Sequence, residues 1–361
     1  TAYRKFGFVR GSNIIYEYAF EEVEVGDYPK SWLSDAGGEV VTLSNYPGKW
    51  LKANELGIPV VSRATALAEL LQDATAISVA GTHGKTTTTS MVTVILQNAG
   101  KDPSFVIGSE MNESGSNAHQ GSGNLFVVEA DESDSTHLAL PLFGSILTNV
   151  DVDHLDHFAT FDNIVESLEQ FVAKIVGPKV LCADDAVCAK IASTQSCRTY
   201  GLGVDADVRA VNVVFADGSC RFDIETRESG SIAQHVLVGS VSVPLRGEHN
   251  VLNATAALTM AMELGVDFEV AAQALSGFRG VARRFDLRGV DHGVTFVDDY
   301  AHLPNEIVAV LRGARDATDS WDRVVAVFQP NRFNRMSVMS GAYADAFGDA
   351  DVVVITDIYS S

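Results

Sequence analysis

The chain has 361 residues, of which 46% are hydrophobic and 20% are charged. This is the composition of a folded globular protein, and the length suits two or three domains of about 100–200 residues each. With 26 Lys and Arg against 47 Asp and Glu, the net charge of −21 argues against a general binder of nucleic acid or of anionic membranes, which both require a basic surface. A local site for a small anionic molecule is compatible with this charge.

Hydropathy and cysteine usage exclude further classes. No apolar stretch approaches the ~20 residues that span a bilayer, and residues 1–13 lack the features of a signal peptide. The four cysteines form no CxxC pair and have no histidine at zinc-ligand spacing, which is typical of reduced thiols in a cytoplasmic protein. Because the chain begins with Thr1 and stops shortly after a predicted strand, we expect it to be a piece of a longer protein.

Residues 1–50 predict little structure, whereas the following part is regular. The first segment contains one candidate strand, at 39–43, and no glycine-rich strand–turn–helix. From residue 52 onward, buried-type strands alternate with helices, which indicates a parallel, doubly wound sheet. The predicted elements are a helix around 64–71, a strand at 76–80, a helix at 86–98, strands at 104–108, 125–128 and 145–147, and a helix at 161–176.

The pattern changes twice in the second half. Residues 207–245 alternate polar and apolar positions between turn residues, which predicts an antiparallel meander. Helices are predicted next, at 249–264 and 268–275. A new α/β series then follows, with a strand at 294–297, a helix at 304–314, a strand at 323–328, a helix at 336–347 and a strand at 352–355.

A phosphate-binding loop is predicted where the strand at 76–80 meets the next helix. The loop reads Gly81-Thr82-His83-Gly84-Lys85-Thr86. Glycines let backbone N–H groups approach phosphate oxygens, and the helix N-terminus favours negative charge. Lys85 can neutralise the β- and γ-phosphates, and the Thr86 hydroxyl can bind Mg²⁺. The alternative is a plain glycine turn before a threonine-rich helix, because Val79 stands where the standard motif has glycine.

Two acidic clusters follow strands of the same predicted sheet, at residues 129–134 and 149–156. The carboxyl ends of parallel strands face the ligand crevice of an open sheet. Carboxylates at that edge, opposite a triphosphate, can hold metal ions that neutralise phosphate oxygens. A single acidic run would instead indicate a solvated turn, so the prediction depends on finding both clusters beside the phosphate loop.

Seven motifs occur in the order in which they appear in the Mur ligases: AGTHGKTTTTSM, VVEADESD, TNVDVDHLDHF, GEHNVLNATAA, FRGVARRFD, DDYAHLPNE and FQPNRFNR. The chain resembles this family from residue 52 to residue 361, and most resembles its alanine-adding members. The resemblance implies an α/β fold of three domains, with a central P-loop-like ATPase domain and two incomplete Rossmann-like domains at the ends. The corresponding ranges are 1–65 for the UDP-binding domain, 66–288 for the ATP-binding domain and 289–361 for the C-terminal domain.

The resemblance also implies a reaction. The alanine-adding bacterial members activate the carboxylate of UDP-N-acetylmuramate with ATP to form an acyl phosphate, whose acyl group they join to the amine of L-alanine during peptidoglycan precursor synthesis. Mg²⁺ is the expected metal, and Mn²⁺ is also compatible with a histidine ligand. No nucleic acid and no membrane insertion is expected, and the sequence does not reveal the oligomeric state.

The family motifs assign roles to individual residues. By resemblance, Lys85, His302, Arg332 and Arg335 are catalytic. Thr86, Glu129 and His154 are the implied metal ligands, and Tyr300, His302, Arg332 and Arg335 form the amino-acid pocket. ATP contacts are implied for Gly81, Thr82, His83, Gly84, Lys85, Thr86, Thr87, His249, Asn250, Arg284 and Asp298.

Two other functions are compatible with the sequence. One is the recycling ligase that attaches a murein tripeptide to UDP-N-acetylmuramate, and the other is a nucleotide-binding remnant without catalysis. The sequence EADESD favours the alanine-adding enzyme over the recycling type. The sequence further predicts that Lys85→Ala abolishes turnover but leaves the fold intact, because a solvated lysine in a loop contributes little to stability.

Overall fold

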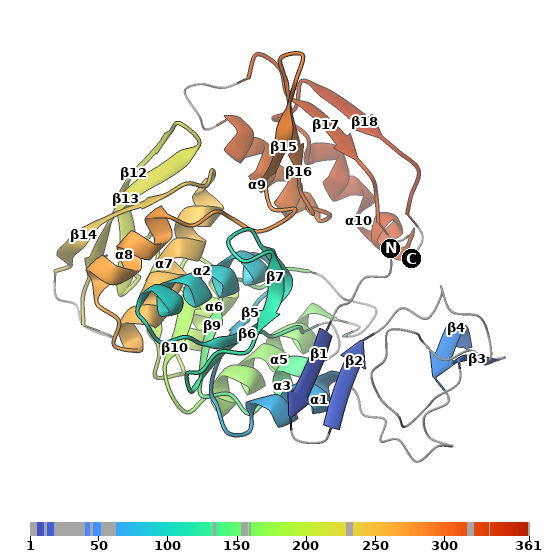
Figure 1. Ribbon diagram of the computed structural model, residues 1–361. Coiled ribbons are helices and arrows are strands. Elements are labelled where there is room, and N and C mark those ends of the chain that lie inside the picture. The colour runs from blue at the N-terminus through green and yellow to red at the C-terminus, as the bar shows by residue number, and fades with distance from the viewer. Residues whose placement is uncertain are drawn as a thin grey trace. The chain divides into compact units, whose positions relative to one another are not determined.

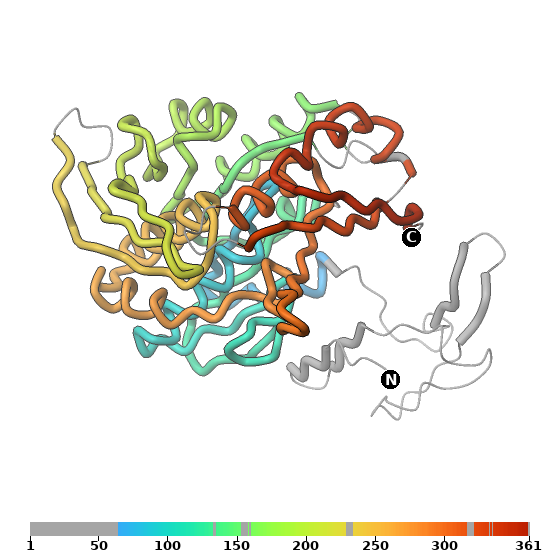
Figure 2. Tube along the Cα trace, turned by 90° about the horizontal axis from the view of Figure 1, so that it is seen from above, coloured from blue at the N-terminus to red at the C-terminus, as the bar shows by residue number. Residues whose placement is uncertain are grey.

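The computed structural model describes residues 6–10, 13–17, 40–43, 46–51, 63–132, 135–152, 158, 160–228, 234–315, 321–331 and 333–359. The chain divides into two compact units, residues 1–72 and 73–361. Figures 1 and 2 show the course of the chain.

In its described residues, the first unit contains two antiparallel strand pairs and one helix. β1 (Phe6–Arg10) pairs with β2 (Asn13–Glu17), and β3 (Val40–Leu43) pairs with β4 (Tyr46–Leu51). Helix α1 follows at Arg63–Leu71. The predicted strand at 39–43 and the predicted helix around 64–71 are therefore confirmed. Most of the predicted UDP-binding range lies outside the described residues.

The second unit is built on a ten-stranded sheet with the order β14-β13-β12-β11-β10-β9-β5-β8-β6-β7. Its central strands run parallel, and β13, β14 and β7 add antiparallel edges. The strands are β5 (Thr75–Ala80), β6 (Ser104–Met111), β7 (Ser116–His119), β8 (Leu125–Glu129), β9 (Gly144–Leu147), β10 (Lys179–Cys182), β11 (Arg198–Gly201), β12 (Val208–Ala216), β13 (Ser219–Thr226) and β14 (Val236–Val243).

Helices cover this sheet on both sides (Figures 1 and 2). Helices α2 (Lys85–Asn98), α7 (Glu248–Glu263) and α8 (Phe268–Ser276) pack against one another, and α5 (Phe161–Lys174) lies on the opposite side. Many small residues of α7, such as Ala254 and Ala257, are fully buried in this layer. Short helices α3 (Thr136–Ala139) and α6 (Ala186–Ala192) complete the set in the described part of this region.

Helix α5 shows how the sequence produces these layers. Ile164, Leu168 and Phe171 are spaced by four and three residues, so all three fall on one face of the helix, and all three are buried. The Thr160 side chain accepts a hydrogen bond from the backbone N–H of Asn163 and caps the N-terminus. The predicted helix therefore forms, with its apolar face toward the core.

The predicted strands and helices of residues 73–276 are confirmed, as is the antiparallel meander. The prediction omitted β7, α3, β10, α6 and β11. These elements are four to seven residues long, which is too short for a period to be recognised. β10 and β11 nevertheless continue the parallel order of the sheet beside β9.

The C-terminal segment forms smaller α/β elements. β15 (Asp286–Asp291) and β16 (Val294–Asp298) make an antiparallel hairpin, and β17 (Val325–Phe328) runs parallel to β18 (Val352–Ile355). Along the chain, α9 (Pro304–Arg315) lies between β16 and β17, and α10 (Phe333–Asp345) lies between β17 and β18. The predicted strands and helices of this segment are thus confirmed, and β15 is an addition to them.

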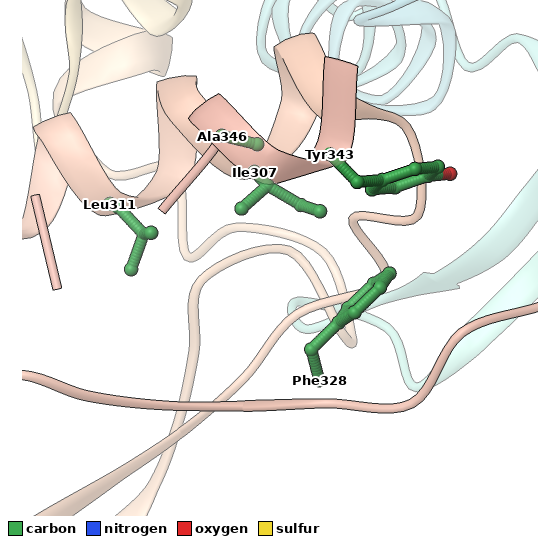
Figure 3. Close-up of a cluster of buried hydrophobic side chains, with 5 residues drawn as sticks. All are labelled: Ile307, Leu311, Phe328, Tyr343 and Ala346. Atoms are coloured by element: carbon green, nitrogen blue, oxygen red, sulfur yellow. The ribbon is translucent and has the colours of Figure 1, made fainter. Parts of the chain in front are cut away.

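A small apolar core holds the C-terminal segment together (Figure 3). Ile307 and Leu311 of α9 are buried together with Phe328 of β17 and with Tyr343 of α10 and the neighbouring Ala346. The rings of Phe328 and Tyr343 lie 5.6 Å apart between centroids. This packing fixes the start of α9, which matters for the site below. In the described part of the chain, no helix is both long and apolar enough to cross a membrane.

Candidate active site

The phosphate loop, residues 81–84, lies at the carboxyl end of a central strand. β5 is flanked by β8 and β9, and all three are parallel, so their carboxyl ends meet at one edge of the sheet. Both acidic clusters begin at this edge. Two glycines of the loop, Gly81 and Gly84, have φ angles of +118° and +80°. A Cβ at Gly84 would also collide with the side-chain oxygen of Asn253.

The segment after β9 holds the loop in place. The Asn149 side chain accepts the His83 N–H at 2.8 Å, and the Thr148 hydroxyl donates to the His83 carbonyl at 2.7 Å. The Asp151 N–H donates to the Thr82 hydroxyl at 2.8 Å. The loop is therefore shaped by side chains that are distant in sequence.

Lys85 is buried and paired, which corrects the expectation of a solvated lysine. Its Nζ donates to Glu132 Oε1 at 2.8 Å and to the Gly81 carbonyl at 2.6 Å, and the two charged side chains are only 14% and 5% exposed. Burial opposes the charge of Lys85, but the Glu132 carboxylate outweighs it and raises the pKa of the ammonium. Burial raises the pKa of Glu132 despite the neighbouring ammonium.

Thr86 and Glu129 lie side by side, as a shared metal site requires. The Thr86 hydroxyl donates to Glu129 Oε1 at 3.1 Å, and Glu129 Oε2 accepts the Gly108 N–H at 2.8 Å. A hydroxyl and a carboxylate are oxygen donors that suit Mg²⁺, which takes few protein ligands and completes its shell with water and phosphate. The third predicted ligand, His154, lies outside the described residues. Among the described residues, no group of three or more His, Cys, Asp and Glu could hold a metal ion.

A cavity of about 340 Å³ opens beside the phosphate loop. His83, Gly84, Thr86 and Thr87 line one side, and the sequence-predicted residues His249, Asn250 and Arg284 line another. The structure therefore brings together residues that are up to about two hundred positions apart. Gly81, Thr82, Lys85 and Glu129 belong to the adjoining loop and strand end and do not line the cavity.

The cavity wall at the start of α7 is tied to helix α2, which follows the phosphate loop. Asn250 Oδ1 accepts a hydrogen bond from Asn253, whose own Oδ1 accepts one from the Thr88 hydroxyl. Burial and the charge of Arg284 lower the pKa of His249 to about 4, so its ring is neutral. The wall therefore offers an uncharged imidazole and an amide rather than a second cation.

The two aspartates of the DDY motif occupy different positions. Asp298, the predicted ATP contact, ends β16 and does not line the cavity, whereas Asp299 does. Asp299 accepts the N–H groups of Phe285 and Ala301, each at 2.7 Å. Burial raises the pKa of its carboxyl. The sequence could not show which of the two aspartates faces the cavity, because this depends on the backbone conformation at the end of β16.

Two residues predicted for the amino-acid pocket, Tyr300 and His302, lie beside each other. The Tyr300 ring lies 4.7 Å from the Arg283 guanidinium and 5.4 Å from that of Arg284, and 5.3 Å from the His302 ring. Arg335 is half-buried in α10 and does not line the cavity. Arg332 lies outside the described residues.

The sequence did not predict one cluster of side chains at the site, which forms around His83. His83 Nε2 lies 3.2 Å from Asp151 Oδ2, and His83 Nδ1 lies 3.2 Å from Glu306 Oε1 in the first turn of α9. Asn305 also donates to Asp151. One signal was present: Glu306 stands two residues after Pro304, the position from which an acidic side chain caps a helix. Nothing in the sequence indicated that it would meet His83.

Comparison with known proteins agrees with this geometry. Residues 79–261 match the Mur ligase middle domain, and residues 283–360 match the glutamate ligase domain of Mur ligases. A UDP-N-acetylmuramate–L-alanine ligase from Bradyrhizobium sp. strain BTAi1 is 43% identical over 333 residues, which make up 90% of this chain and 71% of the relative.

Solved structures give the same result. The UDP-N-acetylmuramate-alanine ligase of Thermotoga maritima matches with a TM-score of 0.72 and 28% identity, over 85% of this chain and 68% of that one. A murein peptide ligase from Psychrobacter arcticus matches with a TM-score of 0.61 and 28% identity, over 84% of this chain and 67% of that one. The phosphate loop, the two acidic strand ends and the cavity are thus set in a known framework. The chain belongs to the Mur ligase family.

Proposed function

We propose that this chain joins L-alanine to the carboxylate of UDP-N-acetylmuramate, at the expense of ATP, in bacterial peptidoglycan precursor synthesis. The observation that carries the proposal is a single cavity lined by the phosphate loop, by the start of α7 and by the segment that leads into α9. The relative from Bradyrhizobium supports the choice of substrates by its name and by its identity over most of this chain.

In the proposed reaction, a carboxylate oxygen of UDP-N-acetylmuramate bonds to the γ-phosphorus of ATP as the bond to the bridging oxygen breaks and ADP leaves. The alanine amine then attacks the acyl carbon, phosphate is expelled, and the amine gives up a proton as the amide forms. Such phosphoryl transfer depends on positioning and on charge neutralisation more than on covalent help from the protein.

The charged residues of the site suit these needs. We infer that Lys85 exchanges its Glu132 partner for the β- and γ-phosphates when ATP binds, and that Thr86 and Glu129 hold Mg²⁺ together with His154. When bound, Mg²⁺ neutralises charge on the phosphate oxygens. The neutral His249, with Asn250, Arg284 and Asp299, contacts the remainder of the nucleotide.

We assign the alanine pocket to Tyr300 and His302, with Arg332 and Arg335 as partners for a carboxylate or an acyl phosphate. Planar guanidinium groups form paired hydrogen bonds with such anions. Support comes from the position of Tyr300 beside Arg283 and Arg284, because Arg284 also lines the cavity.

The predicted domain ranges 1–65, 66–288 and 289–361 stay part of the proposal, as does a cytoplasmic location, where ATP is supplied.

The test is phosphate release from ATP with UDP-N-acetylmuramate and, in turn, alanine, serine, glycine and the murein tripeptide. We expect release with alanine, and weaker release with serine or glycine, since one methyl group changes binding by only ~1–3 kcal/mol. Release with the tripeptide but not with alanine would replace the proposal by the recycling ligase. ATP binding without turnover of any acceptor would indicate the non-catalytic remnant.

A further inference from the structure

The side chain of His83 is held by two carboxylates from distant parts of the chain. Both ring nitrogens lie 3.2 Å from a carboxylate oxygen, Nδ1 from Glu306 and Nε2 from Asp151. A neutral imidazole has one N–H group and could satisfy only one of them, whereas an imidazolium donates to both. The ring is 21% exposed, so the two ion pairs are largely shielded from water.

The two carboxylates are themselves fixed. Asp151 Oδ1 accepts the Val152 N–H at 2.7 Å, and Asn305 donates to Asp151 Oδ2. Glu306 Oε2 accepts the N–H groups of His302 at 2.8 Å and Leu303 at 3.0 Å, which caps the N-terminus of α9. Neither carboxylate can move toward a ligand without breaking these contacts.

The cluster of His83, Asp151, Asn305 and Glu306 therefore joins the phosphate loop to the first turn of α9. The residues proposed to bind alanine, Tyr300 and His302, come directly before that turn. The backbone of His83 is held separately, through Asn149 and Thr148, so the loop keeps its shape without the imidazole.

We propose that His83 is a positioning residue, which couples the phosphate loop to the start of α9 and so places the alanine-binding segment in response to the nucleotide. This rests on the proposed function. The imidazole does not bind the nucleotide in this role. Removal of the imidazole should weaken the use of alanine more than the binding of ATP or ADP, although His83 lies in the ATP motif.

The experiment compares wild type, His83→Ala, Glu306→Gln and the double variant, with His292→Ala as the matched control. His292 also pairs with a carboxylate, Asp291, but its side chain is 92% exposed and lies outside the site. Glu306→Gln keeps an oxygen that can cap α9 and removes the charge that faces His83. It therefore tests the coupling even if His83→Ala folds poorly.

Three measurements are made: ADP binding by calorimetry, kcat and KM for alanine, and hydrogen exchange of the His302 and Leu303 amides with and without ADP. For His83→Ala and Glu306→Gln we expect the ADP Kd to change by less than about threefold and KM for alanine to rise about tenfold, with the double variant no worse than either single one. ADP should slow exchange of the two amides in wild type and in His292→Ala, but not in His83→Ala.

The proposal is overturned if the KM effects of the two single variants multiply in the double variant, if ADP binding weakens as much as alanine binding, or if ADP slows the two amides equally in all variants. A wild-type chain that binds ADP but does not turn over alanine would refute the proposed function. In that case hydrogen exchange alone decides whether the loop and α9 are coupled.

Discussion

Replacing Lys85 with methionine tests the buried ion pair at the phosphate loop. Methionine keeps most of the side-chain volume but leaves the Glu132 carboxylate, which is 5% exposed, without its cation. Glu132 Oε2 already has no hydrogen-bond partner, and Glu132 Oε1 would lose the hydrogen bond from Lys85. Breaking a buried pair on one side costs about 3–5 kcal/mol, so we expect the free energy of unfolding to fall by that amount at pH 8.

The loss should depend on pH with a definite sign. Without Lys85, the pKa of Glu132 stays raised by burial, and a group whose pKa is higher in the folded state stabilises the fold at low pH only. The defect of Lys85→Met should therefore shrink as the pH falls toward the ordinary range for glutamate and grow as the pH rises.

The assay is urea unfolding of wild type, Lys85→Met, Glu132→Gln and the double variant. Lys190→Met, which removes an exposed lysine of α6, serves as the control and should change stability by less than about 0.5 kcal/mol. The double variant no longer has an unpaired buried carboxylate at position 132, so most of the stability should return, although turnover stays abolished. A loss below about 1 kcal/mol in Lys85→Met, independent of pH, would refute the reasoning.

Three further predictions concern the same region. Glu129→Gln should raise the Mg²⁺ concentration for half-maximal phosphate release at least about tenfold, because a charged oxygen ligand is lost; an unchanged Mg²⁺ titration would contradict the metal site. Gly84→Ala, at φ +80° and against Asn253, should destabilise by at least about 1 kcal/mol in thermal unfolding, whereas Gly341→Ala, in a helix with open space around it, should be neutral or stabilising. Burial opposes the charge of His83, but the hydrogen bonds that its ring donates to Asp151 and Glu306 prevail and raise its pKa to about 9. Stability from this ion-pair cluster is therefore complete below about pH 6.5 and is lost as pH rises through 9. The shift corresponds to about 3 kcal/mol, so the stability difference between wild type and His83→Ala should shrink by about that amount as the pH rises from 6 to 10.

Local patterns were sufficient for the framework of the site. The apolar strand at 76–80, the two glycines and the following Lys85 predict a phosphate loop because each acts on its own stretch of backbone. The spacing of Ile164, Leu168 and Phe171 predicts α5 for the same reason. The order of the family motifs, together with parallel strands, was enough to expect Thr86 and Glu129 at one edge of the sheet, and the structure places them 3.1 Å apart. The roles assigned to these residues stay predictions.

Other features of the site depended on which segments meet in the folded chain. The burial of Lys85, its pairing with Glu132, and the position of Asp299 rather than Asp298 in the cavity wall all follow from packing around β5 and α9. His83 and Glu306 are 223 residues apart, and neither has a local pattern that indicates the other. The sequence by itself determined the longer elements and the place of the phosphate loop between a strand and a helix, because these arise from neighbours along the chain. Only the tertiary structure decided which charges are buried and paired, because desolvation and ion pairing depend on the groups that folding brings within a few ångströms.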